Sequence, residues 1–157
     1  MVKKQLPVDF KEFIQFLNKN EVKYLLLGGW AVGIYGKPRT TKDIDFLVSK
    51  DTNNLKKLQK ALDDFGSPPI NLNRFQEDGF VIRIGSSPIL IDVINKASGI
   101  DFDDCYKRRK IVCIEDIDVS VISLEDLIIN KKSSGRDQDT VDAKKLEKLI
   151  EDAENYK

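Results

Sequence analysis

The pattern of apolar and polar positions predicts helices at both ends of the chain and in three places between them. Apolar residues recur every three or four positions over residues 8–19 and 55–65, which is typical of amphipathic helices. We also expect short helices over residues 30–35 and 101–109. Two further helices are expected within residues 124–153.

Short apolar runs between these helices predict six β-strands. The runs cover residues 22–27, 43–48, 80–84, 89–94, 110–114 and 119–122. Acidic and apolar residues alternate in the second run, the period of a strand with one buried face. The third and fourth runs flank Gly85–Pro88, which reads as a hairpin turn. This order of elements favours a mixed β-sheet flanked by helices, an α/β or α+β fold.

Length and composition fit one globular domain. A chain of 157 residues is the usual size of a single domain, so we expect residues 1–157 to form one, with the helices of 124–153 packed on it. The apolar share of 41% and the charged share of 33% are ordinary for a folded protein. Disordered, collagen-like and disulfide-scaffold classes are therefore excluded.

The chain contains no histidine, and its 26 basic and 26 acidic side chains cancel. The first fact excludes Ser-His-Asp and Cys-His nucleophiles and any His-ligated zinc site. The second leaves no large basic field for non-specific binding of nucleic acid. Chemistry must therefore come from carboxylates, lysine, arginine, hydroxyls or the backbone.

The cysteines and the apolar segments indicate a cytoplasmic protein. Cys105 and Cys113 lack the spacing and number of a disulfide framework, so we expect free thiols. The N-terminus lacks the apolar core of a signal peptide. The most apolar segment, residues 24–36, is too short and too glycine-rich to span a bilayer. No membrane segment is expected.

Asp43 and Asp45 carry the strongest functional signal. Aspartate is a poor strand former, yet both lie at alternate positions of a predicted strand, so their carboxylates share one face. Like charges that close repel unless a cation lies between them. Mg²⁺ prefers a few carboxylates completed by water and substrate phosphates. A strand with its polar face in water is the alternative.

Asp92 adds a third carboxylate, from the second strand of the predicted hairpin. Its face would otherwise hold Leu90 and Ile94, and burying even a neutral polar group there costs roughly 2–7 kcal/mol. Arg83 shares that face, so it can pair with Asp92 or reach a phosphate; the ion pair is favoured.

Gly28 and Gly29 join a predicted strand to a predicted helix. Glycines allow the backbone to approach an oxyanion, and a helix N-terminus offers free N–H groups, so the junction suits a phosphate. A simple tight turn is the alternative. Arg39 is a plausible phosphate contact in the loop that follows, whereas Lys42 reads as a solvated charge. Trp30 is expected to pack in the core.

Together these residues resemble a known superfamily. Gly28-Gly29-Trp30, then Arg39-x-Thr41-x-Asp43-Ile44-Asp45, then a strand carrying Asp92, are similar to the motifs of polymerase-β-like nucleotidyltransferases. The nearest resemblance is to small bacterial members, the AbiEii-type toxins and the lincosamide nucleotidyltransferases. Many members have Gly-Ser where this chain has Gly28-Gly29.

The resemblance implies a nucleotidyltransferase fold and a set of roles. Gly28, Gly29, Arg39 and Thr41 would hold the nucleotide, and Asp43 and Asp45 would bind two Mg²⁺ ions. Asp92 would share one ion and act as general base on the acceptor hydroxyl. Two ions roughly 3.5–4 Å apart stabilise both the attacking and the leaving oxygen, so no histidine is needed.

A C-terminal stretch from Lys131 to Asp142 resembles the Lys…Gly-Arg-x-x-Asp-x-x-Asp signature of the same families. By that likeness Lys131 would contact the triphosphate and Asp139 would orient it. Acids in a first helical turn also suit the helix dipole. Because Asp139 and Asp142 extend an apolar stripe, they need a partner, and Lys131 or Arg136 is the obvious one. The basic run 107–110 reads as a solvated face, or as a patch that steers RNA.

These observations lead to two hypotheses of different classes. The first is an Mg²⁺-dependent enzyme that moves a nucleoside monophosphate from an NTP to a hydroxyl of a tRNA, a protein or a small molecule. Such an enzyme could be a toxin held by an antitoxin protein, and a homodimer could complete its acceptor site. The second is a catalytically inactive module of the same fold that binds a nucleotide or a partner.

Overall fold

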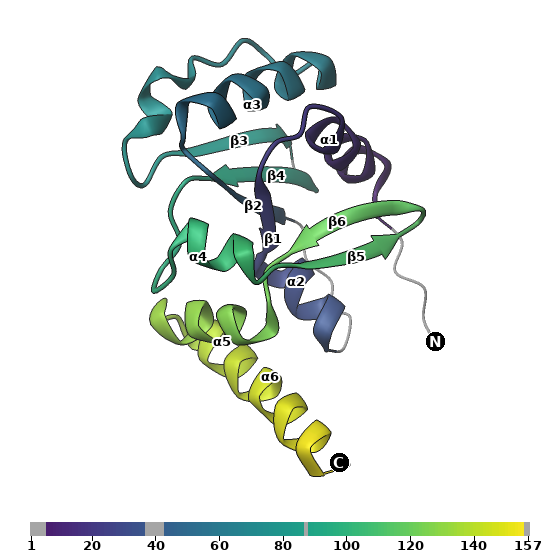
Figure 1. The fold of residues 1–157 in the computed structure, drawn as a ribbon, viewed down its shortest axis with the longest axis vertical. Helices are drawn as coiled ribbons and strands as arrows, with labels where there is room; N and C mark the ends of the chain where they lie inside the picture. The colour runs from purple at the N-terminus through teal and green to yellow at the C-terminus, as the bar shows by residue number, and fades with distance from the viewer. Residues whose placement is uncertain (1–5, 37–42, 87, 156–157) are drawn as a thin grey trace.

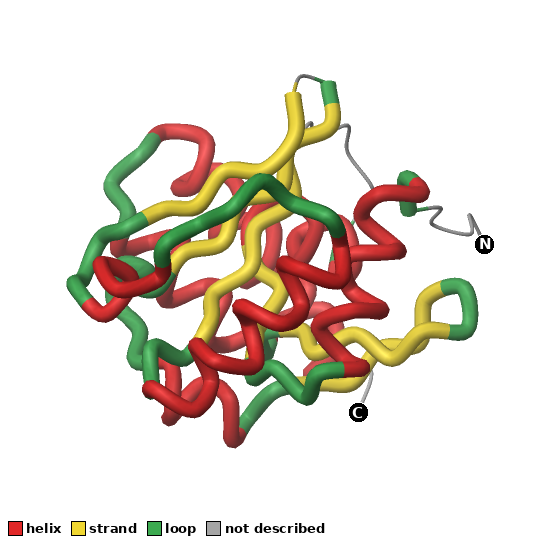
Figure 2. Tube along the Cα trace, turned by 90° about the horizontal axis from the view of Figure 1, so that it is seen from above, coloured by secondary structure: helices red, strands yellow, loops and turns green. Residues whose placement is uncertain are grey.

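A computed structural model of the chain describes residues 6–36, 43–86 and 88–155. Six strands form one mixed sheet with helices on both sides (Figures 1 and 2). The strands are β1 (Tyr24–Leu27), β2 (Asp43–Val48), β3 (Val81–Ser86), β4 (Ile89–Ile94), β5 (Lys110–Ile114) and β6 (Ile117–Val121). The helices are α1 (Val8–Lys19), α2 (Gly28–Tyr35), α3 (Thr52–Phe65), α4 (Phe102–Lys107), α5 (Leu124–Ser133) and α6 (Asp137–Asn155), with a 3-10 helix η1 (Leu72–Gln76).

The strands lie in the order β3-β4-β2-β1-β6-β5. The hairpin pairs β3/β4 and β5/β6 are antiparallel, as is β1/β2, whereas β2/β4 and β1/β6 are parallel. The expected mixed sheet flanked by helices is confirmed. The parallel pair β2/β4 matters most, because it sets the two aspartate-bearing strands side by side.

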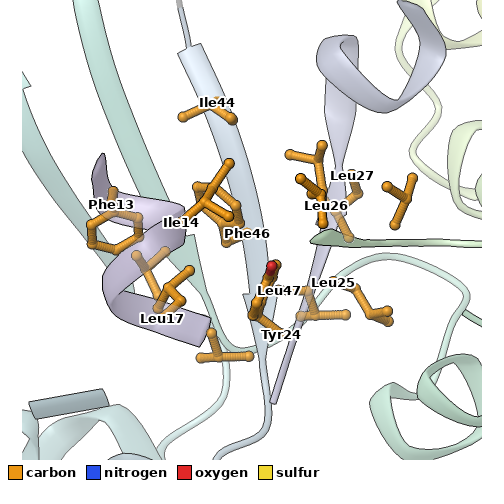
Figure 3. Close-up of a cluster of buried hydrophobic side chains, with 14 of the residues drawn as sticks. Phe13, Ile14, Leu17, Tyr24, Leu25, Leu26, Leu27, Ile44, Phe46 and Leu47 are labelled. Atoms are coloured by element: carbon orange, nitrogen blue, oxygen red, sulfur yellow. The ribbon is translucent and has the colours of Figure 1, made fainter. Parts of the chain in front are cut away.

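Helices α1 and α3 cover one face of the sheet with aromatic side chains. Phe13 of α1 packs against Phe46 of β2 and Phe65 of α3, with ring centroids 5.5 and 5.2 Å apart. The ring of Tyr24 of β1 also packs against that of Phe46, with centroids 5.7 Å apart. Figure 3 shows this cluster, with Ile14 and Leu17 of α1 turned toward β2. On this face β2 buries Ile44, Phe46 and Val48, and its two aspartates face the other way, as does the buried Leu47.

Helices α2, α5 and α6 gather on the far side of the sheet from this cluster, and α5 and α6 pack against each other (Figure 1). Ser123 caps α5, since its hydroxyl accepts a hydrogen bond from the backbone N–H of Asp126. The Asp126 carboxylate instead accepts two bonds from Arg108, which ties α4 to α5. Apart from the segments left undescribed, no helix is long and apolar enough to cross a membrane.

The structure corrects several predicted boundaries. Helix α2 begins at Gly28 rather than at residue 30, so both glycines belong to its first turn. Helix η1 was not predicted, because Leu72 and Phe75 lie in a stretch otherwise rich in polar residues. Strand β6 begins at Ile117 rather than 119. A two-residue turn allows this, with Glu115 and Asp116 at φ values of 50° and 68°.

Candidate active site

The three predicted carboxylates come together on neighbouring strands. Asp45 of β2 is the direct register partner of Asp92 of β4, and Asp43 lies opposite Leu90. Asp43 and Asp45 are half-buried and alternate with fully buried neighbours, so they share the face that the period of two predicted. Asp92 is 6% exposed. Parallel pairing therefore places three acids within one small area of the sheet.

Among the residues that the structure describes, Arg83 of β3 is the cation that forms ion pairs with this group of acids. It stands directly opposite Asp92 in the β3/β4 register. Its Nε donates to one Asp92 oxygen at 2.8 Å and its Nη2 to the other at 3.0 Å. Its Nη2 also lies 3.8 Å from Oδ2 of Asp43. The favoured ion pair is confirmed, and these bonds raise the pKa of Arg83 further above its ordinary value.

Asp45 lies between repelling and attracting charges. Burial, followed by the neighbouring charges of Asp92 and Asp43, raises the pKa of Asp45 to about 6. The cations of Lys131 and Arg136 act in the opposite direction, which brings the C-terminal helices within electrostatic reach of the carboxylates. At Asp45, burial and the neighbouring acids therefore outweigh the two cations.

Position 28 requires a glycine because the side chain of Asp45 occupies the space that a Cβ would take. Leu27, the last residue of β1, is the register partner of Asp45, and the chain turns into α2 at the next residue. Gly28 has φ +68°, and a Cβ there would lie 2.2 Å from Oδ2 of Asp45. The N-terminus of α2 and a proposed catalytic carboxylate are therefore in direct contact.

A second charged cluster links α5 to α6. The buried ammonium of Lys131 lies 2.9 Å from Asp139 and 3.5 Å from Asp142, both buried. Ser134 and Arg136 also donate to Asp139, at 2.5 and 3.0 Å. Burial raises the pKa of Asp139, but the bonds from Ser134 and Lys131 outweigh it, so the pKa is lowered. The predicted need of these acids for a basic partner is confirmed.

The predicted residues fall into these two groups. Asp43, Asp45, Asp92 and Gly28 form the first, and Gly29 is buried in the first turn of α2 behind it. Lys131 and Asp139 belong to the second, where they bind each other. Arg39 and Thr41 lie outside the described residues. The Ser134 contact was missed, although a polar residue beside the helix-ending Gly135 was a signal for it.

Carboxylate oxygens on adjacent strands are a suitable donor set for a hard divalent cation. Within the described segments, however, no three acidic or cysteine side chains are gathered as a ready metal cage. Both oxygens of Asp92 accept bonds from Arg83. The residues therefore fit Mg²⁺ in chemistry.

A cavity of about 800 Å³ lies elsewhere, beside Ser49, Asn95 and Lys96, which directly follow β2 and β4. None of the three carboxylates lines it. Its amides are already used within the fold: Asn95 donates to the carbonyls of Phe75 and Glu77. The cavity is therefore separate from the carboxylate site.

Comparison with known proteins identifies the class. Residues 5–154 match the family described as "Nucleotidyltransferase of unknown function (DUF6036)", and the chain belongs to this nucleotidyltransferase family. The predicted membership of a nucleotidyltransferase family is thereby confirmed. Among curated proteins, no sequence matches the chain significantly.

Solved structures of nucleotidyltransferases share the fold. The lincosamide antibiotic adenylyltransferase LnuA, bound to lincomycin, superposes with a TM-score of 0.60 at 15% identity, over 92% of this chain and 98% of that one. The antibiotic-resistance factor ANT(2'')-Ia gives 0.56 at 14%, over 94% and 90%. A putative nucleotidyltransferase from Thermotoga maritima gives 0.56 at 14%, over 91% of each chain. At these identities the similarity establishes the fold.

The contact between Gly28 and Asp45 predicts that Gly28→Ala is costly. The left-handed backbone alone costs an alanine about 1 kcal/mol, and displacing the carboxylate adds roughly 1–3 kcal/mol. Gly66→Ala is the matched control, because Gly66 has φ +82° and nothing within 4 Å of an added Cβ. Urea unfolding should show the larger loss for Gly28→Ala, and equal losses would contradict the contact.

The raised pKa of Asp45 predicts a pH-dependent effect of Asp45→Asn. Folding favours the protonated acid, so its contribution is complete below the unfolded pKa and is lost as pH rises through about 6. In EDTA at pH 8 the variant should be more stable than wild type by about 3 kcal/mol, and at pH 3.5 equally stable.

Asp78→Asn is the control for this pH series. Its bond and ion pair with Lys50 lower the pKa of Asp78, so its substitution should remove stability at pH 8. Thermal melting across pH would measure both variants. An Asp45→Asn protein no more stable than wild type at pH 8 would argue against uncompensated charge at Asp45.

The buried position of Lys131 predicts that Lys131→Met destabilises the fold by roughly 3–5 kcal/mol, because two buried carboxylates lose their ammonium partner. Lys132→Met is the matched control. Lys132 is exposed and pairs with the exposed Glu147, an interaction worth less than about 1 kcal/mol. Similar losses in chemical denaturation would show that the buried cluster is not stabilising.

Proposed function

We propose that this protein transfers a nucleoside monophosphate from an NTP to a hydroxyl acceptor with release of pyrophosphate, and that Asp43, Asp45 and Asp92 are its catalytic carboxylates. One observation carries the proposal: the three acids meet on one face of β2 and β4, at the point where β1 turns into α2. Membership of a nucleotidyltransferase family supports it.

In this proposal the carboxylates bind two Mg²⁺ ions. When bound, the ions neutralise the charge on the phosphates and activate the attacking oxygen. Asp43 and Asp45 provide oxygen ligands from alternate positions of one rigid strand. Asp92 provides a further oxygen and accepts the proton of the acceptor hydroxyl, a task within reach of its position opposite Asp45.

The start of α2 is the proposed site for the nucleotide phosphates. Gly28 and Gly29 lie in the first turn of this helix, where backbone N–H groups have no partner within the helix and attract anions. Asp45 touches the same turn, so a phosphate bound there would lie beside the carboxylates. Arg39 and Thr41 are proposed to complete this contact.

Lys131 and Asp139 have an indirect role in this scheme. Lys131 lies between two buried acids rather than in an open position. Its charge nevertheless acts on Asp45, as does that of Arg136, which Asp139 holds. We infer that this cluster supplies positive potential near the triphosphate. Direct contact with the nucleotide would require Lys131 to leave one acid.

The proposed reaction requires that the acceptor carry a hydroxyl group, and it does not define the rest of the acceptor. The structure of LnuA contains bound lincomycin, and a structure of ANT(2'')-Ia contains an adenylylated tobramycin. A small molecule is therefore the first acceptor to test. A tRNA end and a protein hydroxyl remain the other candidates. The proposals of a toxin, an antitoxin partner and a homodimer likewise need direct tests.

An inactive binding module is the second candidate, and one observation favours it. Arg83 binds both oxygens of Asp92, as it would in a fold retained for binding alone. Such a module would bind nucleotide weakly or without dependence on Mg²⁺. Calorimetry of ATP binding with Mg²⁺ and with EDTA distinguishes the two.

The proposed function predicts label transfer from an α-³²P-NTP in the presence of Mg²⁺. The acceptor pool should contain aminoglycoside and lincosamide antibiotics, small metabolites, total RNA and cell protein. Wild type should label one fraction, and Asp45→Asn should reduce the rate by at least about 10³-fold, because the charge that stabilises the transition state is lost.

Asp78→Asn is the control, since it removes the same charge from an exposed ion pair outside the carboxylate group. Its rate should stay within about twofold of wild type. Transfer by Asp45→Asn at the wild-type rate would contradict the proposal. Mg²⁺-independent nucleotide binding with no labelled fraction would favour the binding module.

A further inference from the structure

We propose that Arg83 is a resident counter-ion that competes with divalent cations for Asp92, so that a metal can bind all three carboxylates only when Arg83 leaves. The inference rests on the proposed metal role of these acids. It adds a residue that controls when the site accepts metal.

The first argument is the geometry of the pair. Arg83 uses two nitrogens to bind both oxygens of Asp92, in the bidentate arrangement that makes arginine–carboxylate pairs strong. The guanidinium also lies near a second acid, since its Nη2 is 3.8 Å from Oδ2 of Asp43. A metal shared by Asp43, Asp45 and Asp92 needs at least one Asp92 oxygen, and each of these already accepts a bond from Arg83. Two cations so close would repel each other.

The second argument is that Asp92 needs a cation in either state. It is 6% exposed, and an ionised carboxylate at that depth is unfavourable without a partner. The other described cations that act on this group are engaged elsewhere, since Lys131 and Arg136 both bind Asp139. Arg83 therefore stabilises the metal-free protein, and a metal must replace the bonds that it removes.

The third argument is that Arg83 is the solvent-exposed member of the pair. It extends from the edge strand β3, and its side chain is 57% exposed. Exposed charges regain water when they leave a partner, so withdrawal of Arg83 carries a modest cost. The acid is buried in the sheet while the arginine is more than half exposed, and this asymmetry makes the arginine the exchangeable partner.

The test is Mn²⁺ binding without nucleotide, measured by electron paramagnetic resonance for wild type, Arg83→Gln, Asp92→Asn and the double variant. Arg83→Gln should bind Mn²⁺ about tenfold more tightly than wild type, because the competitor is gone. In the Asp92→Asn background the same substitution should change affinity by less than about twofold, since the contested ligand is absent.

Two further variants serve as controls. Arg83→Lys keeps the charge but cannot make two parallel bonds, so its affinity should lie between those of wild type and Arg83→Gln. It also keeps the test open if Arg83→Gln does not fold. Arg74→Gln removes an equal charge from an arginine that stacks on Phe80, and should bind Mn²⁺ as wild type does.

A second readout is the melting temperature. Arg83→Gln should melt below wild type in EDTA, and Mn²⁺ should raise its melting temperature by more than that of wild type. Equal Mn²⁺ affinity of wild type and Arg83→Gln would overturn the inference while leaving the proposed function intact. The inference would also be overturned if Arg83→Gln increased the Mn²⁺ affinity equally in the wild-type and Asp92→Asn backgrounds. That result would indicate long-range repulsion between Arg83 and the metal. Mn²⁺ binding by neither protein would overturn the metal site itself, and the inference with it.

Discussion

The repulsion among three carboxylates on one face of the sheet is the constraint on which the rest of the site depends. The parallel register of β2 and β4 places Asp45 beside Asp92, with Asp43 two residues away. No fold holds such a group without compensation, and this one uses several kinds. Arg83 neutralises Asp92, more distant cations act on Asp45, and the pKa of Asp45 remains raised to about 6. A site built in this way is poised to take up positive charge.

The surrounding helices and strands hold the three carboxylates and the cations near them in place. The aromatic core between α1, α3 and β2 fixes the strand, so that its alternate residues must face the site. The absent side chain of Gly28 lets α2 begin against Asp45. The pair α5 and α6 brings Lys131 and Arg136 within electrostatic range while two buried acids hold the lysine. Stability and chemistry are thus linked through the same ion pairs.

Much of this arrangement was predictable from the sequence, because it depends on periodicity. The alternation in residues 43–48 predicted a shared face for Asp43 and Asp45, and the hairpin predicted that Arg83 would face Asp92; both are confirmed. The contact of Gly28 with Asp45 was not predictable, since it depends on which strands are neighbours. Helix η1 and the Ser134 bond to Asp139 escaped because their signals are local and weak. The roles of Arg39 and Thr41 stay predictions.

The central claim is that the carboxylates of β2 and β4 form a cation site at the start of α2. The most direct test is a crystal structure with Mn²⁺ and a non-hydrolysable NTP analogue, with the metal located by anomalous scattering. The account predicts Mn²⁺ coordinated by Asp45 and Asp92, with Arg83 withdrawn from Asp92 and the phosphates at the first turn of α2. Manganese bound elsewhere, with Arg83 still on Asp92 and the nucleotide away from Gly28, would contradict it.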